Sequence, residues 1–190
     1  MKKIKPYILL YMKKNKFSID YPLRGSDILK ILNNNTNIIE YKQLYNIEDL
    51  EDIFINGSCV ILYRSAPNLA HWCCIFKNIY GLEFFDPYGC IIDNEINEIE
   101  EMNPNYANNY YNNGHKRLLE LVLKTGYNEL TYNNYKLQQM KHNINTCGRH
   151  CAVRLLFKNL NLEDYVDYLF KISKNKYLDE IVLKITNKLI

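Results

Sequence analysis

Three runs of β-branched and aromatic residues in the first half of the chain predict neighbouring strands. They span residues 58–65, 71–78 and 80–89, and short turn-forming stretches separate them. Apolar residues follow one another in these runs rather than alternating with polar ones, which is typical of strands buried on both faces of a sheet. One further strand is expected within residues 127–139.

Helical patterns flank this strand region. Short helices are expected within residues 21–35, where Ser26 or Asp27 supplies the N-cap, and within residues 46–54. Residues 94–114 are acidic and rich in asparagine, and we expect them to form a surface loop or a frayed helix.

The second half of the chain predicts four helices, within residues 115–126, 146–160, 162–175 and 177–190. The last has an apolar face made of Leu178, Ile181, Val182, Ile185 and Leu189. Together these elements indicate an α+β fold in which a central mixed sheet is packed by helices, and we expect residues 1–190 to form a single domain.

The composition is that of a globular protein. The chain has 190 residues, 47% of them hydrophobic, which is enough to bury a core without disulfides or metals. The net charge of +3 favours only a weak association with DNA, because dedicated nucleic-acid modules are usually more basic. No apolar stretch has the length of a membrane span. We therefore expect a soluble monomer without membrane contact.

The beginning of the chain has a basic start and a short apolar run. Pro6 breaks this run, Lys13 and Lys14 close it, and no small-residue cleavage site follows. These features argue against a signal peptide and for an intracellular protein.

Six cysteines are present, at positions 59, 73, 74, 90, 147 and 151. Cys73 and Cys74 are adjacent within a strand-like run, and the spacing lacks the paired cysteines of a structural zinc site. We expect free thiols in a reducing compartment, with no metal and no organic cofactor.

Cys147 stands at the start of the apolar helix predicted for residues 146–160. With Asn145 or Thr146 as the N-cap, its thiol lies among unpaired backbone N–H groups, at the positive end of the helix dipole. Both features favour the thiolate, which is the nucleophilic form. Gly148 lets a substrate backbone approach closely. The alternative is that Cys147 is a small apolar residue in a core helix, because free cysteine is often buried.

His71 and Asp86 are candidates for a base and its orienting acid. If the strands that carry them form an antiparallel hairpin, the end of one lies beside the start of the other, so Asp86 can reach His71. His115 and His142 lie in polar loops, and His150 is anchored about one turn deeper in the helix of Cys147. The alternatives are an interior histidine and a plain Asp-Pro-Tyr-Gly turn.

In their order along the chain, these residues resemble the adenovirus-type and SUMO-protease-type cysteine peptidases. The shared motif has four parts: His-Trp at 71–72, Phe-Asp-Pro-Tyr-Gly at 85–89, glutamines at 138–139 and Cys-Gly at 147–148. The form "NTCGRHCAVRL" is most similar to that of maturation proteases of virophages, self-synthesising DNA transposons and related large DNA viruses. The resemblance covers roughly residues 22–160. It implies a papain-related arrangement with the nucleophile at the start of a buried helix.

The resemblance also implies the roles of individual residues. Cys147 corresponds to the nucleophile, His71 to the general base and Asp86 to the group that orients it. Trp72 corresponds to the aromatic residue that lines a narrow cleft beside the histidine. A narrow cleft implies substrates with Gly or another small residue before the cut.

A glutamine amide completes the oxyanion hole in the resembling enzymes. Gln138 and Gln139 are both candidates here, nine and eight positions before Cys147. The family has its glutamine slightly closer to the cysteine, so the spacing favours Gln139. Strand alternation points one of the two toward the site and leaves the choice open.

The leading functional expectation is a viral maturation endopeptidase that cleaves capsid precursor proteins in the virion and in the cytoplasmic viral factory. A deconjugating protease for ubiquitin-like proteins shares every catalytic residue, but the compact chain has no obvious appended recognition domain. An acyltransferase with the same residue order and a non-catalytic structural protein rank lower.

Overall fold

The computed structural model describes residues 17–127, 129–174 and 176–190, so the prediction about a signal peptide within residues 1–16 lies outside the described residues. The centre of the fold is a five-stranded sheet in the order β1-β2-β3-β4-β5. The strands are β1 (Asn37–Glu40), β2 (Ser58–Ala66), β3 (Leu69–Asn78), β4 (Gly81–Phe85) and β5 (Leu130–Tyr132). Strands β2, β3 and β4 pair antiparallel, whereas β1 and β5 add to the two edges in parallel. The predicted α+β fold with a mixed sheet is therefore confirmed.

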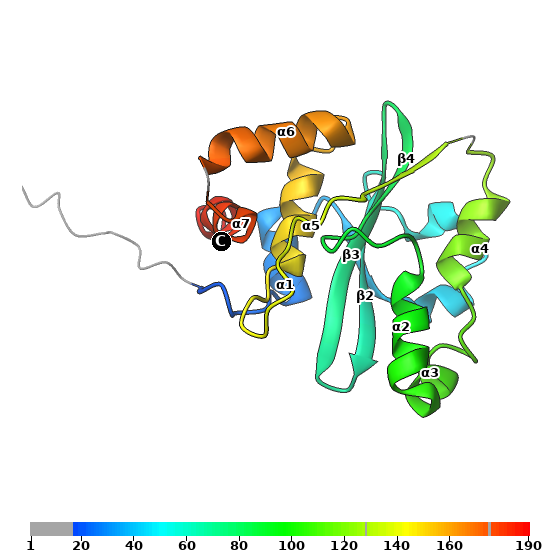
Figure 1. Cartoon of the computed structure of the whole chain (residues 1–190). Coiled ribbons are helices and arrows are strands. Elements are labelled where there is room, and N and C mark those ends of the chain that lie inside the picture. Colours follow the sequence, from blue (N-terminus) through cyan, green and yellow to red (C-terminus); the bar gives the residue numbers. More distant parts are fainter. Residues whose placement is uncertain (1–16, 128, 175) are drawn as a thin grey trace, which may run out of the picture.

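Helices cover both faces of the sheet (Figure 1). One face packs against α1 (Gly25–Ile31), α5 (Cys147–Leu156), α6 (Leu162–Ser173) and α7 (Leu178–Asn187). The other packs against α2 (Asn94–Met102), α3 (Pro104–Tyr110), α4 (Arg117–Lys124) and the 3₁₀ helices Tyr41–Asn46 and Leu50–Ile53.

The residues of β3 alternate between the two cores. Trp72 and Cys74 belong to the core with α5, and Cys73 and Ile75 belong to the core with α2. Each of these side chains is at most 8% exposed. The continuous apolar character of the central strands thus has the predicted cause, which is burial on both faces.

Three parts of the chain differ from the expectation. Residues 94–114 form the helices α2 and α3, so of the two expected alternatives the helix is right and the surface loop is wrong. The expectation missed that Ile96, Ile99, Ala107 and Tyr111 are buried in the second core. The dense asparagine and glutamate residues mask this sparse apolar pattern. The helix expected within residues 46–54 shortens to the 3₁₀ turn Leu50–Ile53, and the four-residue β1 follows an asparagine run that gives little strand signal.

Helix α5 is buried through polar as well as apolar side chains. Every residue from Cys147 to Leu155 is buried, including Arg149, His150 and Arg154. Arg154 donates to both carboxylate oxygens of Glu83 in β4, at 2.7 Å each. This bidentate ion pair fixes α5 against the central sheet, so α5 is a rigid mount for its first residue.

No helix among the residues that the structure describes combines the length and the apolarity needed to cross a bilayer.

Candidate active site

The sheet and α5 together gather the predicted site residues. Cys147 is the first residue of α5, and His71 lies near the start of β3. Asp86 directly follows β4, whose last residue Phe85 pairs with Cys74. This antiparallel register brings the end of β4 beside the start of β3, as the hairpin argument predicts.

His71 is held by Asp86 and Tyr88. Its Nε2 lies 2.9 Å from Asp86 Oδ1, and the Asp86 side chain is only 1% exposed. The Tyr88 ring stacks on the imidazole with centroids 4.6 Å apart, and the Tyr88 backbone N–H donates to Asp86 Oδ1 at 2.7 Å. The predicted contact between His71 and Asp86 is therefore present, and the ring orientation is fixed from two directions.

The surroundings of His71 favour its protonated form. Burial lowers the pKa of His71, but the neighbouring Cys73 and hydrogen bonding to Asp86 and Cys147 raise it, and the resulting pKa lies well above 6.5. Cys147 therefore lies next to an imidazole that readily takes up a proton. Cys147 itself is 8% exposed, so the sulfur is shielded but not sealed off.

The two candidate glutamines point to different parts of the molecule. Gln138 is buried, and its Nε2 donates to Tyr88 Oη at 3.1 Å and to the Ile144 carbonyl at 3.2 Å. Gln139 is half-buried, and its Nε2 donates to Asp179 Oδ2 at 3.3 Å. Since Tyr88 stacks on His71, Gln138 lies on the side of His71, whereas spacing favours Gln139.

Trp72 and Gly148 pack against each other. The Trp72 Nε1–H donates to the Leu23 carbonyl at 3.0 Å, and the ring is 8% exposed. A Cβ at position 148 would lie 3.0 Å from Trp72 Cδ1 and 3.2 Å from Ile28 Cδ1. The absence of a side chain at Gly148 thus permits the seating of Trp72 against Ile28 of α1, and the close substrate approach expected from the sequence stays a prediction.

A hollow of about 370 Å³ adjoins Trp72. Its lining comes from the start of α1, from β1 and from β2, and includes Arg24, Gly25, Ile38, Glu40, Leu62 and Arg64. Arg64 Nη2 pairs with Glu40 Oε1 at 2.7 Å across one wall. The Trp72 ring therefore borders a polar-rimmed groove whose lining residues come from outside α5.

Two residues beside the imidazole have no role in the predictions made from the sequence. Tyr88 stacks on the ring, and Glu95 Oε1 of α2 lies 3.8 Å from His71 Nε2. Burial raises the pKa of Glu95 to about 7, although the positive charge of His71 opposes this shift. Glu95 could not be found from the sequence because the packing of α2 was not predicted.

Cys73 completes a compact set of potential metal-ligand atoms. One atom each from Cys73, His71 and Asp86 lies within 4.8 Å of the others, and all three residues are buried. His71 Nε2 is already bonded to Asp86, so a metal bound there would compete with that contact. These three residues therefore include the bonded His71–Asp86 pair and are also of the types that bind zinc.

The other three histidines have partners other than Cys147 or are exposed. His150 is fully buried and its Nε2 lies 3.2 Å from Asp179 Oδ1. His115 pairs with Glu120 at 3.0 Å on the surface, and His142 is exposed. His71 is thus the histidine that the structure brings to Cys147.

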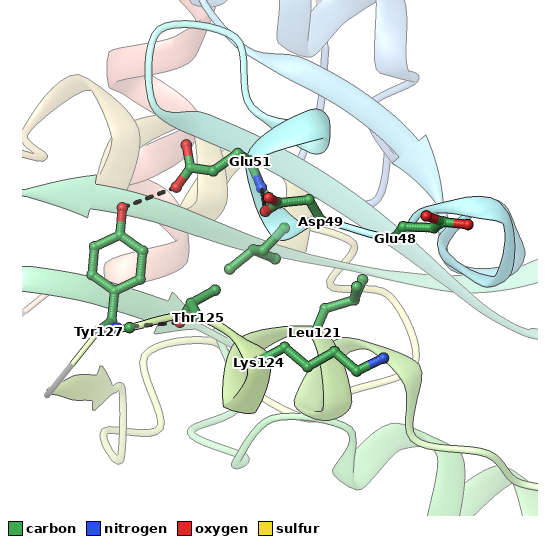
Figure 2. Close-up of a pocket in the computed structure, with 9 residues that line it drawn as sticks. Glu48, Asp49, Glu51, Leu121, Lys124, Thr125 and Tyr127 are labelled. Atoms are coloured by element: carbon green, nitrogen blue, oxygen red, sulfur yellow. Dashed lines mark hydrogen bonds between the residues drawn. The ribbon is translucent and has the colours of Figure 1, made fainter.

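A second hollow, of about 490 Å³, lies between the Leu50–Ile53 turn and the end of α4 (Figure 2). Glu48, Asp49 and Glu51 contribute carboxylates, and Tyr127 Oη donates to Glu51 Oε1 at 3.0 Å. The described residues that line it include no cysteine or histidine. The candidate for nucleophilic chemistry is therefore the site at the start of α5.

Comparisons with known proteins give a related sequence and a weakly similar structure. No family model matches the chain. The uncharacterized protein V9 of Sputnik virophage is 34% identical over 183 residues, which cover 92% of this chain and 99% of that protein. A crystal structure of a de-sumoylating protease aligns with a TM-score of 0.29 at 18% identity, over 88% of this chain and 66%, just under two thirds, of that one. So low a score supports no statement about function.

Proposed function

The chain belongs to the family of protein V9 of Sputnik virophage, and we propose that it is a cysteine endopeptidase that cleaves viral capsid precursors. One observation carries the chemistry. The imidazole of His71 is hydrogen-bonded to the buried Asp86 and lies close enough to Cys147 for the thiol to raise its pKa. Nucleophile, base and orienting group in this relation are the arrangement of a cysteine protease.

The first step is attack by the thiolate. His71 takes the thiol proton of Cys147, and the sulfur forms a bond to the scissile carbonyl carbon as the C=O π bond opens. Asp86 holds Nε2, which leaves Nδ1 for the thiol and stabilises the imidazolium. The elevated pKa of His71 favours this proton transfer.

We assign two N–H donors to the resulting oxyanion. The backbone N–H of Cys147 lies in the first turn of α5 and has no intrahelical acceptor. The side-chain amide of Gln138 is our choice for the second donor, in place of Gln139. Its two N–H groups are bonded to Tyr88 Oη and to the Ile144 carbonyl, so it would exchange the bond to Tyr88 for one to the oxyanion. Such preorganised donors stabilise charge that develops on the carbonyl oxygen.

Collapse of the tetrahedral intermediate releases the amine. The His71 imidazolium gives its proton to the leaving nitrogen as the C–N bond breaks, and a thioester to Cys147 remains. Water then attacks the thioester with His71 as base, which frees the carboxylate product and restores the thiol. None of these steps requires a metal or an organic cofactor.

Capsid precursors are proposed as substrates because the related protein is encoded by a virophage. The reaction would then take place in viral factories and in assembling virions. The discriminating experiment offers the purified chain virion capsid proteins and ubiquitin-like conjugates side by side. Site-specific trimming of the capsid proteins supports the proposal, whereas cleavage of the conjugates alone would reassign the substrate class.

We expect peptides with Gly before the cut to be cleaved about tenfold to a hundredfold faster than matched Leu peptides. Trp72 is fixed by Leu23 and packed on Gly148, so a bulky residue would have to displace the ring, at a cost of about 1–3 kcal/mol. The measurement is kcat/KM for both peptides with the wild type and with Trp72→Ala.

The Trp72→Ala protein should accept Leu better while cleaving the Gly peptide more slowly. Its folding is checked by circular dichroism, because removing a buried indole destabilises a core by about 3–5 kcal/mol. Equal kcat/KM values for the two peptides in the wild type would show that the cleft is not narrow.

A further inference from the structure

Asp179, in the first turn of α7, is a fully buried carboxylate that the proposed mechanism does not use. Its Oδ1 accepts a hydrogen bond from Thr146 Oγ1 and lies 3.2 Å from His150 Nε2. Its Oδ2 accepts from the backbone N–H and the side-chain amide of Gln139, at 3.2 and 3.3 Å. Both oxygens are therefore occupied, and the side chain is a fixed point between α7, α5 and the segment before α5.

Two of these partners are next to the proposed oxyanion donors. Thr146 immediately precedes Cys147, and Gln139 immediately follows Gln138. The N–H of Gln138 donates to the Pro87 carbonyl at 3.0 Å. The Gln138–Gln139 segment is thereby held between the end of β4 and α7, and the start of α5 is tied to the same carboxylate.

The carboxylate remains ionised despite its burial. Burial alone would raise the pKa of Asp179, but hydrogen bonds from His150, Thr146 and Gln139 outweigh this effect and lower the pKa below 3.8. An ionised carboxylate only accepts hydrogen bonds, so it can hold all of these donors at once.

We infer that Asp179 is a positioning residue of the oxyanion hole. Through Thr146 and Gln139 it keeps the Cys147 N–H and the Gln138 amide at a fixed separation. The inference rests on the proposed function. It adds a residue that lies beyond residues 22–160, the part of the chain that carries the sequence motif.

The test compares Asp179→Asn with the wild type on a Gly-containing peptide. An asparagine amide can still accept from Thr146, but its NH₂ group meets the Gln139 donors and cannot accept from them. We expect kcat to fall about tenfold to a hundredfold with little change in KM, because a displaced oxyanion donor acts on the transition state.

A second pair of measurements separates positioning from general damage. A peptide aldehyde adds to the Cys147 sulfur and places its oxygen in the oxyanion hole, whereas iodoacetamide alkylates the sulfur without needing the hole. Asp179→Asn should weaken aldehyde binding by the same factor as kcat and leave the alkylation rate of Cys147 unchanged.

Thr186→Ala is the matched control, because it removes another buried contact between α5 and α7. Thr186 Oγ1 accepts from Arg149 Nη1 at 2.6 Å and touches neither Thr146 nor Gln139. The Thr186→Ala substitution should lower thermal stability and leave kcat and aldehyde affinity near the wild-type values. If Asp179→Asn fails to fold, Thr146→Val removes one donor to Asp179 with little change in shape and should show the same split.

The outcomes distinguish this inference from the proposed function. If the wild type is active and Asp179→Asn has the same kcat and aldehyde affinity as Thr186→Ala, the positioning role alone is overturned. The same holds for Thr146→Val where it replaces Asp179→Asn. A folded wild type that neither cleaves peptides nor binds the aldehyde overturns the proposed function, and the positioning role falls with it.

Discussion

Replacing Cys147 with alanine should abolish peptide cleavage, lowering kcat/KM by a factor on the order of 10⁴ to 10⁶. Without the sulfur no thioester can form, and a water molecule in its place would be a much weaker nucleophile than the thiolate. Cys73 is the other thiol near His71, but it is fully buried in the core with α2, so we expect it not to replace Cys147. The measurement is single-turnover hydrolysis of a Gly-containing peptide with protein verified as folded.

Cys151→Ala is the matched control for this variant. Cys151 lies one turn further along α5, fully buried, and its thiol donates to the Trp72 carbonyl at 3.2 Å. Its loss should destabilise the fold by about 1 kcal/mol and leave the chemistry in place. Full activity in Cys147→Ala, or loss of activity in Cys151→Ala alone, would show that the nucleophile is wrongly assigned.

The second large effect is expected at the base. His71→Ala should lower kcat by about 10³- to 10⁵-fold, because both the proton acceptor and the proton donor to the leaving amine disappear. Asp86→Asn should cost less, on the order of 10²- to 10³-fold, because it loses only the fixed tautomer and the stabilised imidazolium. Tyr88 continues to hold the ring plane in that variant.

Glu83→Gln separates the orienting acid from a structural one. Glu83 lies in β4, three residues before Asp86. Its carboxylate pairs with Arg154 in α5 and not with His71. Breaking this buried ion pair should lower the free energy of unfolding by about 3–5 kcal/mol, measured by urea denaturation. Normal kcat in Asp86→Asn together with a loss of kcat in folded Glu83→Gln would assign the acid to Glu83 instead.

The parts of the site that sequence could predict depend on local features. The hairpin between β3 and β4 fixes the His71–Asp86 contact through short-range pairing, and Cys147 is recognisable from the start of a single helix. Apolar runs marked β2, β3 and β4 because both faces of these strands are buried. Such patterns need no knowledge of distant segments.

The missed residues depend on long-range packing. Glu95 reaches His71 only because α2 packs on the second core, and its few apolar residues are hidden among asparagine and glutamate. Gln138 and Gln139 differ in direction because Asp179, from the far end of the chain, takes the amide of Gln139. Spacing from Cys147 carries no information about that contact.

The central claim, that His71 activates Cys147 as a nucleophile, is tested most directly by site-resolved alkylation with iodoacetamide near neutral pH. Cys90 is the internal reference, because it is only half-buried and burial raises its pKa to about 11. If accessibility governed reactivity, Cys90 would react before Cys147, which is 8% exposed. We predict that mass spectrometry finds Cys147 labelled first in the wild type, and no faster than Cys90 in His71→Ala. Faster labelling of Cys90 than of Cys147 in the folded wild type would contradict the claim.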